Sequence, residues 1–272
     1  MGAGIAQACA VAGIPVTMID VDAARITRAR TAIGDGLARS VSRGTLAAHE
    51  RAAAIERLRG ATSYEALSGC DFVIEAATED EALKIGILRR VGGVLREDAV
   101  IATNTSSISI GRLAATLERP AAFVGTHFFN PVARMNLVEV VRGPQTGEST
   151  VDASVALAKK LGKTPVVVKD APGFVVNRLL CPMLNEAALV YSEGIASASD
   201  IDEAMKLGCN HPIGPLALCD LIGIDVVVAV MKVFHRDFQD PKYRPAPLLE
   251  EMAAAGRLGR KTGRGFYTYD TP

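Results

Sequence analysis

The sequence predicts an α/β protein with a helix-covered parallel sheet in its first half and only helices in its second. Two observations predict this class. Up to about residue 168, short runs of nearly continuous apolar residues alternate with longer stretches of helical periodicity, which is typical of parallel strands buried on both faces. From Phe174 onward, helical spacing continues almost to the end. The pattern changes at residues 170–173, so the expected domains are residues 1–168 and 169–272.

The elements of the first domain are expected in a regular order. A small-residue helix from Gly4 leads through Gly13 into a buried strand at 15–20, and a charged, alanine-rich stretch from 23 to about 59 has helical spacing. The alternation continues as strand 71–75, helix 81–96, strand 99–103, helix 108–117, strands 121–126 and 137–141, helix 149–161 and strand 165–168.

Four helical segments are expected in the second domain, near 174–193, 199–207, 214–236 and 246–256, and only residues 265–269 look extended. The third segment is nearly continuous in hydrophobicity from Val226 to Phe234, which is more apolar surface than a small helical layer buries internally. We therefore expect a homodimer through this domain. Burial within one chain is the alternative.

The overall composition excludes several classes of protein. The 272 residues include 30 Lys+Arg and 30 Asp+Glu, so no net charge favours binding to nucleic acid or to a membrane surface. The 5 cysteines are scattered without a Cys-x-x-Cys pair, which predicts free thiols in a reducing compartment and no metal site. No apolar run approaches the ~18 residues that span a bilayer. The expected location is the cytoplasm.

A histidine and a glutamate fall on neighbouring expected strands. His127 follows the apolar run 121–126 and precedes Phe-Phe-Asn-Pro, and Glu139 lies inside the run 137–141. Adjacent strands would bring the imidazole and the carboxylate together at one end of the sheet. A carboxylate bound to one ring nitrogen fixes the tautomer, so the other nitrogen can transfer a proton. A structural histidine buried under a turn is the alternative.

The N-terminal residues match part of a dinucleotide-binding unit. In such a unit, a strand and Gly-x-Gly-x-x-Gly precede a helix, and an acidic residue ends the second strand ~20 residues after the motif. Gly2 occupies the place of the third glycine and Asp20 that of the ribose-binding acid, which favours NAD over NADP. Arg25 is expected to lie too far into the next helix to offset this preference.

The first strand and the first two glycines of that unit are missing from this sequence. We therefore expect a strand-wide gap between the strand that ends at Asp20 and strand 71–75, weaker NAD binding, and a functional protein that starts upstream.

Short motifs of one family occur in order along the whole chain. They are residues 1–7, 73–76, 104–107, 127–139, 170–178, 205–208, 212–215, 220–223 and 259–267. With these motifs the chain resembles the 3-hydroxyacyl-CoA dehydrogenases, and most closely the bacterial 3-hydroxybutyryl-CoA dehydrogenases. The resemblance implies a Rossmann-like doubly wound sheet followed by an all-helical domain for substrate binding and dimerisation. It also implies NAD as the cofactor and an acyl-CoA as the substrate.

The resemblance implies roles for four residues in the reaction. His127 would be the general base for the substrate's 3-hydroxyl, and Glu139 would orient it. Asn177 would bind the reacting oxygen. Ser106 would bind the same oxygen or the nicotinamide, and its alternative role is an N-cap for helix 108–117.

The remaining implied residues bind cofactor and substrate. Arg43, with its helix neighbours Arg39 and Arg28, would meet the CoA phosphates, although exposed arginines on one helix are also an ordinary solvated surface. Glu79 and Lys84 likewise fit a solvated helix face. The implied cofactor contacts are Gly2, Asp20, Glu79, Lys84, Ser106, Asn130 and Lys261.

Two other functions stay open on the sequence alone. A β-hydroxyacid or polyol-phosphate dehydrogenase of similar plan typically relies on a lysine where this chain offers His127 and Glu139. A catalytically silent binding protein is supported only by the missing glycines. The preferred acyl-chain length is undetermined, because one methylene changes binding by only ~1–3 kcal/mol. The physiological direction and the pathway are undetermined as well.

Overall fold

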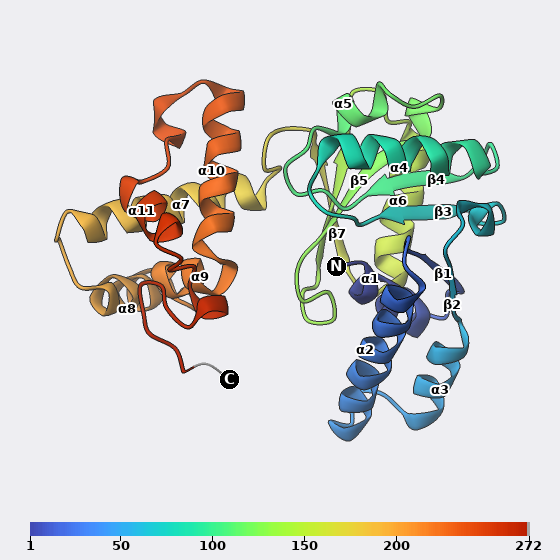
Figure 1. Ribbon diagram of the computed structural model, residues 1–272, viewed down its shortest axis with the longest axis horizontal. Coiled ribbons are helices and arrows are strands. Elements are labelled where there is room, and N and C mark those ends of the chain that lie inside the picture. Colours follow the sequence, from blue (N-terminus) through green and yellow to red (C-terminus); the bar gives the residue numbers. More distant parts are fainter. Residues whose placement is uncertain (271–272) are drawn as a thin grey trace. The chain divides into compact units, whose positions relative to one another are not determined.

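The computed structural model describes residues 1–270, which form two compact units (Figure 1). The first unit is Met1–Ala171 and the second begins at Pro172. Each has a hydrophobic core of its own. Among these residues, no helix is both long and apolar enough to cross a membrane.

A five-stranded sheet, in the order β3-β4-β5-β6-β7, forms the centre of the first unit. All neighbouring strands are parallel except β5 and β6, which are antiparallel. The sheet is therefore mixed, whereas the apolar runs predicted a purely parallel one. The chain returns after β5 without a crossover helix, and such a short return requires an antiparallel pair. The strands are β3 (Phe72–Glu75), β4 (Val100–Thr103), β5 (Phe123–Phe128), β6 (Leu137–Arg142) and β7 (Thr164–Lys169).

A second sheet contains two parallel strands, β1 (Val16–Ile19) and β2 (Leu58–Ala61). The expectation of one helical stretch from 23 to about 59 is wrong, because this stretch contains α2 (Ala23–Ser42), α3 (Ala48–Glu56) and the start of β2. The sequence Leu-Arg-Gly-Ala has little strand propensity of its own, so the pairing with β1 decides its conformation. A side chain at position 60 would overlap Ile26 of α2, so the glycine permits the helix to approach.

The gap expected beside β1 is confirmed. β1 pairs with β2 and β3 pairs with β4, and within residues 1–270 no ladder joins β1 to β3. The two sheets are thus separate at the position where the dinucleotide-binding pattern has its first strand.

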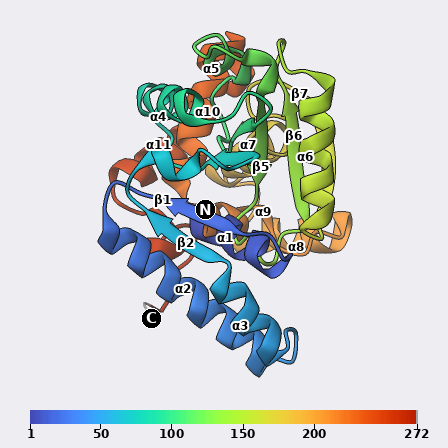
Figure 2. The ribbon, with the colours of Figure 1, turned by 90° about the vertical axis from the view of Figure 1, so that its right-hand side faces the viewer.

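Helices cover both faces of the five-stranded sheet (Figure 2). α1 (Gly2–Val11) and α6 (Glu148–Lys160) share one core with the central strands, and its buried residues include Ile5, Val151 and Val124. α4 (Glu81–Val94) and α5 (Ile110–Ala114) lie on the other face. α5 starts two residues later than the expected helix 108–117, because its N-cap is Ser109, whose hydroxyl accepts from the N–H of Arg112, and it ends three residues earlier.

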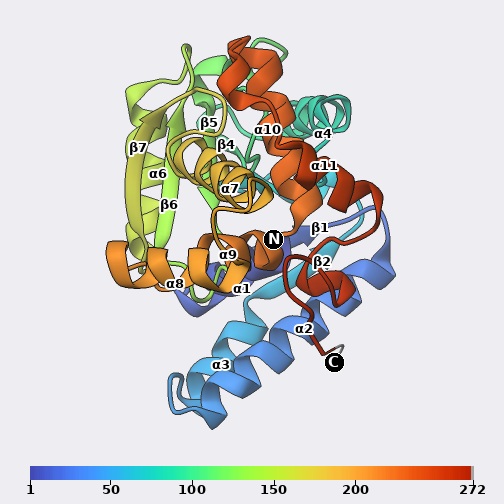
Figure 3. The same ribbon diagram turned by 90° about the vertical axis from the view of Figure 1, so that its left-hand side faces the viewer.

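The second unit is helical, as expected (Figure 3). The expectation of a single helix over 214–236 is wrong, because Gly223, at φ 109°, separates α9 from α10. The argument from the apolar run in α10 also needs correction, since Val227, Met231 and Phe234 are buried within the unit itself. The helices are α7 (Val176–Ser192), α8 (Ala198–Cys209), α9 (Pro215–Ile222), α10 (Ile224–Phe238) and α11 (Pro247–Ala254).

The buried carboxylate of Asp220 binds the last described segment of the chain through hydrogen bonds. Arg264 and Thr268 form an isolated bridge, so residues 265–269 are not the extended strand that was expected. Asp220 accepts hydrogen bonds from the N–H of Phe266 and the hydroxyl of Tyr269, at 3.0 and 2.9 Å. Burial and the contact with Asp220 raise the pKa of Tyr269 to about 12. The phenol therefore stays a donor to Asp220 at neutral pH.

Candidate active site

His127 and Glu139 lie directly opposite each other on the antiparallel strands β5 and β6. Their side chains point to the same face, since residues in register on paired strands share a face. His127 Nδ1 lies 2.7 Å from Glu139 Oε2, and both side chains are buried. The ring of Phe129 packs 4.5 Å from the imidazole, centroid to centroid. A carboxylate on Nδ1 fixes the tautomer of the ring and leaves Nε2 as the nitrogen available for proton transfer.

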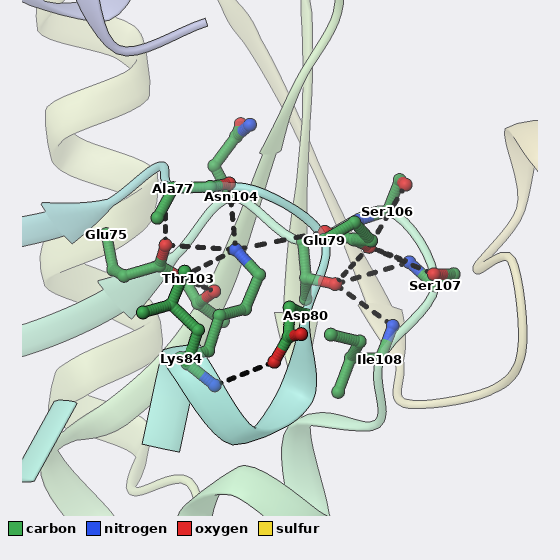
Figure 4. A network of polar contacts seen from close by, with 12 residues as sticks. Glu75, Ala77, Glu79, Asp80, Lys84, Thr103, Asn104, Ser106, Ser107 and Ile108 are labelled. Atoms are coloured by element: carbon green, nitrogen blue, oxygen red, sulfur yellow. Dashed lines mark hydrogen bonds and ion pairs between the residues drawn. The ribbon is translucent and has the colours of Figure 1, made fainter. Parts of the chain in front are cut away.

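The turn after β4 is held in place by Glu79 (Figure 4). One oxygen of its carboxylate, Oε1, accepts from the hydroxyl of Thr105 at 2.6 Å and from the N–H groups of Ser106 and Ser107 at 2.8 and 3.0 Å. The hydroxyl of Ser106 lies 3.2 Å from the same oxygen. The alternative role of Ser106 as a helix N-cap is therefore wrong, because α5 is capped by Ser109.

Glu79 is ionised in this network. Burial opposes its charge, but the hydrogen bonds from Thr105, Ser106 and Ser107 and the attraction of Lys84 outweigh that effect, so the pKa of Glu79 is lowered. The charged oxygen is the common acceptor of the hydrogen bonds that hold the turn in its conformation. This position for Glu79 differs from the solvated helix face that its sequence context suggested.

Behind Glu79 lies a buried ion pair. Lys84 is completely buried, and its Nζ donates to both carboxylate oxygens of Glu75, at 2.9 Å each, and to the carbonyl of Ala77 at 3.3 Å. Its distance to Glu79 Oε2 is 3.8 Å. Lys84 is thus not part of a solvated helix face. The helix carries it under the loop that follows β3.

Glu75 is a residue that the sequence reasoning missed. The hydroxyl of Thr103 donates to it at 2.6 Å and the N–H of Ala77 at 2.5 Å, in addition to Lys84. The signal was present, because an acidic residue that ends an apolar strand seldom stays buried without a cation. Asn104 was missed as well. Its side-chain oxygen accepts from the N–H of Phe128 at 2.9 Å, which links the turn after β4 to the end of β5, beside His127.

Two of the expected cofactor residues, Asp20 and Gly2, lie near the ends of β1 and β3, respectively. Gly2 begins α1, and a side chain there would contact Ala76 in the loop after β3. α1 has neither a side-chain cap nor an acidic residue in its first turn. Its N-terminal amides and the half-exposed carboxylate of Asp20 are therefore suited to a pyrophosphate and to a ribose, respectively.

Arg25 lies closer to the end of β1 than its place in the sequence suggested. Its guanidinium Nη1 is 3.8 Å from Asp20 Oδ1, whereas the sequence placed it too far into the next helix to offset the preference for NAD. The reason is that α2 begins at Ala23, which leaves Arg25 in the first turn, and helical side chains lean towards the N-terminus of their helix.

The expected arginines of α2 lie apart from these groups. Arg43 ends α2, and that helix of 20 residues separates it from Asp20 by about 30 Å at 1.5 Å per residue. Arg39 and Arg43 are exposed, and so is Arg28, which lies 3.8 Å from Asp22. Asn130 follows β5 and precedes Pro131.

Two expected residues belong to the second unit. Asn177 is in the first turn of α7, and Lys261 lies in the short helical turn Arg260–Thr262. Within that unit, Lys261 Nζ donates to Asp225 at 2.7 Å.

Comparisons with known proteins cover both units. A model of the 3-hydroxyacyl-CoA dehydrogenase NAD-binding domain matches residues 1–171, and a model of the C-terminal domain of the same enzymes matches residues 173–269. A 3-hydroxybutyryl-CoA dehydrogenase of Bradyrhizobium diazoefficiens is 46% identical over 99% of this chain and 92% of its own. One of Clostridioides difficile is 44% identical over 99% and 96%. The crystal structure of (S)-3-hydroxybutyryl-CoA dehydrogenase from Ralstonia eutropha superposes with a TM-score of 0.97, at 55% identity over 99% and 95%.

Proposed function

The chain belongs to the 3-hydroxyacyl-CoA dehydrogenase family, and from this premise we propose that it interconverts (S)-3-hydroxyacyl-CoA and 3-ketoacyl-CoA with NAD. The observation that carries the proposal is the buried pair of His127 and Glu139, 2.7 Å apart, within an NAD-binding domain. Relatives named 3-hydroxybutyryl-CoA dehydrogenase support a short-chain substrate, 3-hydroxybutyryl-CoA, whose oxidised form is acetoacetyl-CoA.

His127 acts as the general base in the oxidation. It accepts the proton of the 3-hydroxyl, and NAD supplies the acceptor for the hydride from the same carbon. In the reverse direction the protonated imidazole returns the proton to the ketone oxygen. Glu139 stabilises the charged imidazole and fixes its tautomer. Such proton transfer typically raises the rate of the chemical step ~10²–10⁴-fold.

The other proposed residues bind and position. Ser106 and Asn177 bind the reacting oxygen, and Glu79 and Lys84 hold the turn that carries Ser106. Arg43 binds the CoA phosphates from its exposed position at the end of α2. The proposed cofactor contacts are Gly2, Asp20, Glu79, Ser106, Asn130 and Lys261. The sequence also suggested Lys84, but its side chain is completely buried, so we propose that it acts through Glu79 and does not touch the cofactor.

A substrate comparison tests the activity. We expect the purified protein to oxidise NADH in the presence of acetoacetyl-CoA and to show little activity with free acetoacetate, because the CoA moiety supplies binding energy. The measurement is the loss of NADH absorbance. Equal rates on the two substrates would favour a β-hydroxyacid dehydrogenase, and no rate on either would favour a silent binding protein. A longer 3-ketoacyl-CoA in the same assay reports the acyl-chain preference.

We also propose that the protein is a cytoplasmic homodimer formed through the second unit. The free thiols of all five cysteines support a reducing compartment. Exposed apolar side chains on the helices of the second unit support the dimer, among them Leu221 (52% exposed) and Val226 (42%).

Light scattering at micromolar concentration is expected to give twice the mass of one chain. Leu221→Asp should weaken the dimer, because it places a charge on the proposed interface. Leu83→Asp is the matched control, since Leu83 is comparably exposed (47%) but lies in the first unit. A monomeric mass for the wild-type protein would refute the dimer.

A further inference from the structure

Four charged residues surround the end of β1 and the start of α2. They form two ion pairs, Arg25 with Asp20 and Arg28 with Asp22, each at 3.8 Å. We propose that Arg25 determines cofactor specificity together with Asp20. In the wild-type protein, the carboxylate of Asp20 pairs with the guanidinium of Arg25. When the charge of Asp20 is removed, Arg25 becomes able to bind the 2′-phosphate of NADP. The inference rests on the proposed function, because it places the adenosine ribose at Asp20.

The ion pair does not serve mainly to stabilise the fold. The side chains of Arg25 and Asp20 are 62% and 36% exposed, and exposed ion pairs contribute little in water. Asp20 accepts one further hydrogen bond, from the N–H of Asp22 at 3.2 Å. The carboxylate therefore remains at the surface, where we expect it to accept from a ribose hydroxyl and to repel a phosphate.

With Asp20 neutral, the charge at this position changes sign. Arg25 loses its counter-ion, and a guanidinium is well suited to bind the oxygens of a phosphate. The first turn of α2 keeps Arg25 beside the end of β1, so no rearrangement of the backbone is needed.

Arg28 provides an internal comparison on the same helix. It is similarly exposed, at 67%, but its partner Asp22 is the N-cap of α2 and accepts from the N–H of Ala24 at 2.8 Å. Replacing Asp20 leaves that carboxylate in place, so Arg28 stays paired. The proposal therefore assigns the gain in NADP binding to Arg25 and not to Arg28.

The test is a fluorescence titration of NADH and NADPH on the purified protein without substrate. The wild type should bind NADPH at least about tenfold more weakly than NADH. Asp20→Asn, which preserves the shape of the side chain, should weaken NADH and tighten NADPH about tenfold. In the Asp20→Asn background, Arg25→Ala should abolish the gain in NADPH binding. Arg28→Ala should leave the gain within about twofold, since it removes a charge one turn further along the helix.

Two results would overturn the proposal. One is equal NADPH affinity in Asp20→Asn with and without Arg25, and the other is a loss with Arg28→Ala as large as the loss with Arg25→Ala. If Asp20→Asn folds poorly, as judged by circular dichroism, Asp20→Ser replaces it in the same series. Because the titration needs no substrate, failure of the acetoacetyl-CoA assay and failure of this inference are distinguishable.

Discussion

Replacement of His127 by alanine is expected to lower kcat by at least about 100-fold, with folding and NADH affinity nearly unchanged. The imidazole is the proposed acid and base of the reaction, and its removal leaves proton transfer to water. Glu139→Ala should lower kcat by a similar factor, because it removes the group that fixes the tautomer at 2.7 Å from Nδ1.

The measurements are steady-state kinetics with acetoacetyl-CoA, NADH titration and circular dichroism on each variant. His49→Ala is the matched control, since His49 is an exposed histidine on α3, and it should retain wild-type kcat. Retention of more than a tenth of the wild-type kcat by His127→Ala would show that the assignment is wrong. The double variant is expected to be little slower than either single one, because the two residues act as a unit.

The second large effect is expected at the buried pair of Glu75 and Lys84. Lys84→Met should lower the free energy of unfolding by about 3–5 kcal/mol, because it leaves the carboxylate of Glu75 buried without its cation. Glu75→Gln should cost a similar amount by leaving the ammonium of Lys84 unpaired. Urea unfolding followed by circular dichroism measures both losses.

The double variant Glu75→Gln, Lys84→Met tests the cause. Glutamine preserves an acceptor for the N–H of Ala77 and a polar partner for the hydroxyl of Thr103, and neither position 75 nor position 84 then carries a charge. We expect the double variant to recover at least half of the loss, since replacing both members of a buried pair is often neutral. Arg112→Met breaks an exposed pair with Glu81 and should cost less than about 1 kcal/mol. Additive losses in the double variant would contradict an electrostatic origin.

Local pattern was sufficient for much of the first unit. The apolar runs predicted β3, β4, β5 and β6 near their observed positions, because a strand buried on both faces is apolar along its whole length. The same runs placed His127 and Glu139 on successive strands. The two side chains face each other because β5 and β6 are antiparallel and pair in a register that places His127 opposite Glu139. The sequence did not reveal that direction or that register.

The predictions from sequence were wrong for residues whose conformation or burial depends on a partner far away in the chain. β2 forms only because β1 is beside it, and Lys84 is buried because Glu75, Thr103 and the loop after β3 close around it. A lysine on a helix is expected to be solvated unless the fold supplies a counter-ion. The residues near it in the sequence do not specify that counter-ion.

The sequence by itself determined the fold class, the family and the residue types available for proton transfer and cofactor binding. Periodicity and motifs encode these properties within a few residues of each position. The tertiary structure alone decided the antiparallel β5–β6 pair, the network from Glu75 through Lys84 to Glu79, and the contact between Arg25 and Asp20. Each of these features depends on which segments of the chain pack together. The free energy of such packing comes from interactions between residues on separate elements, which no single segment of sequence specifies.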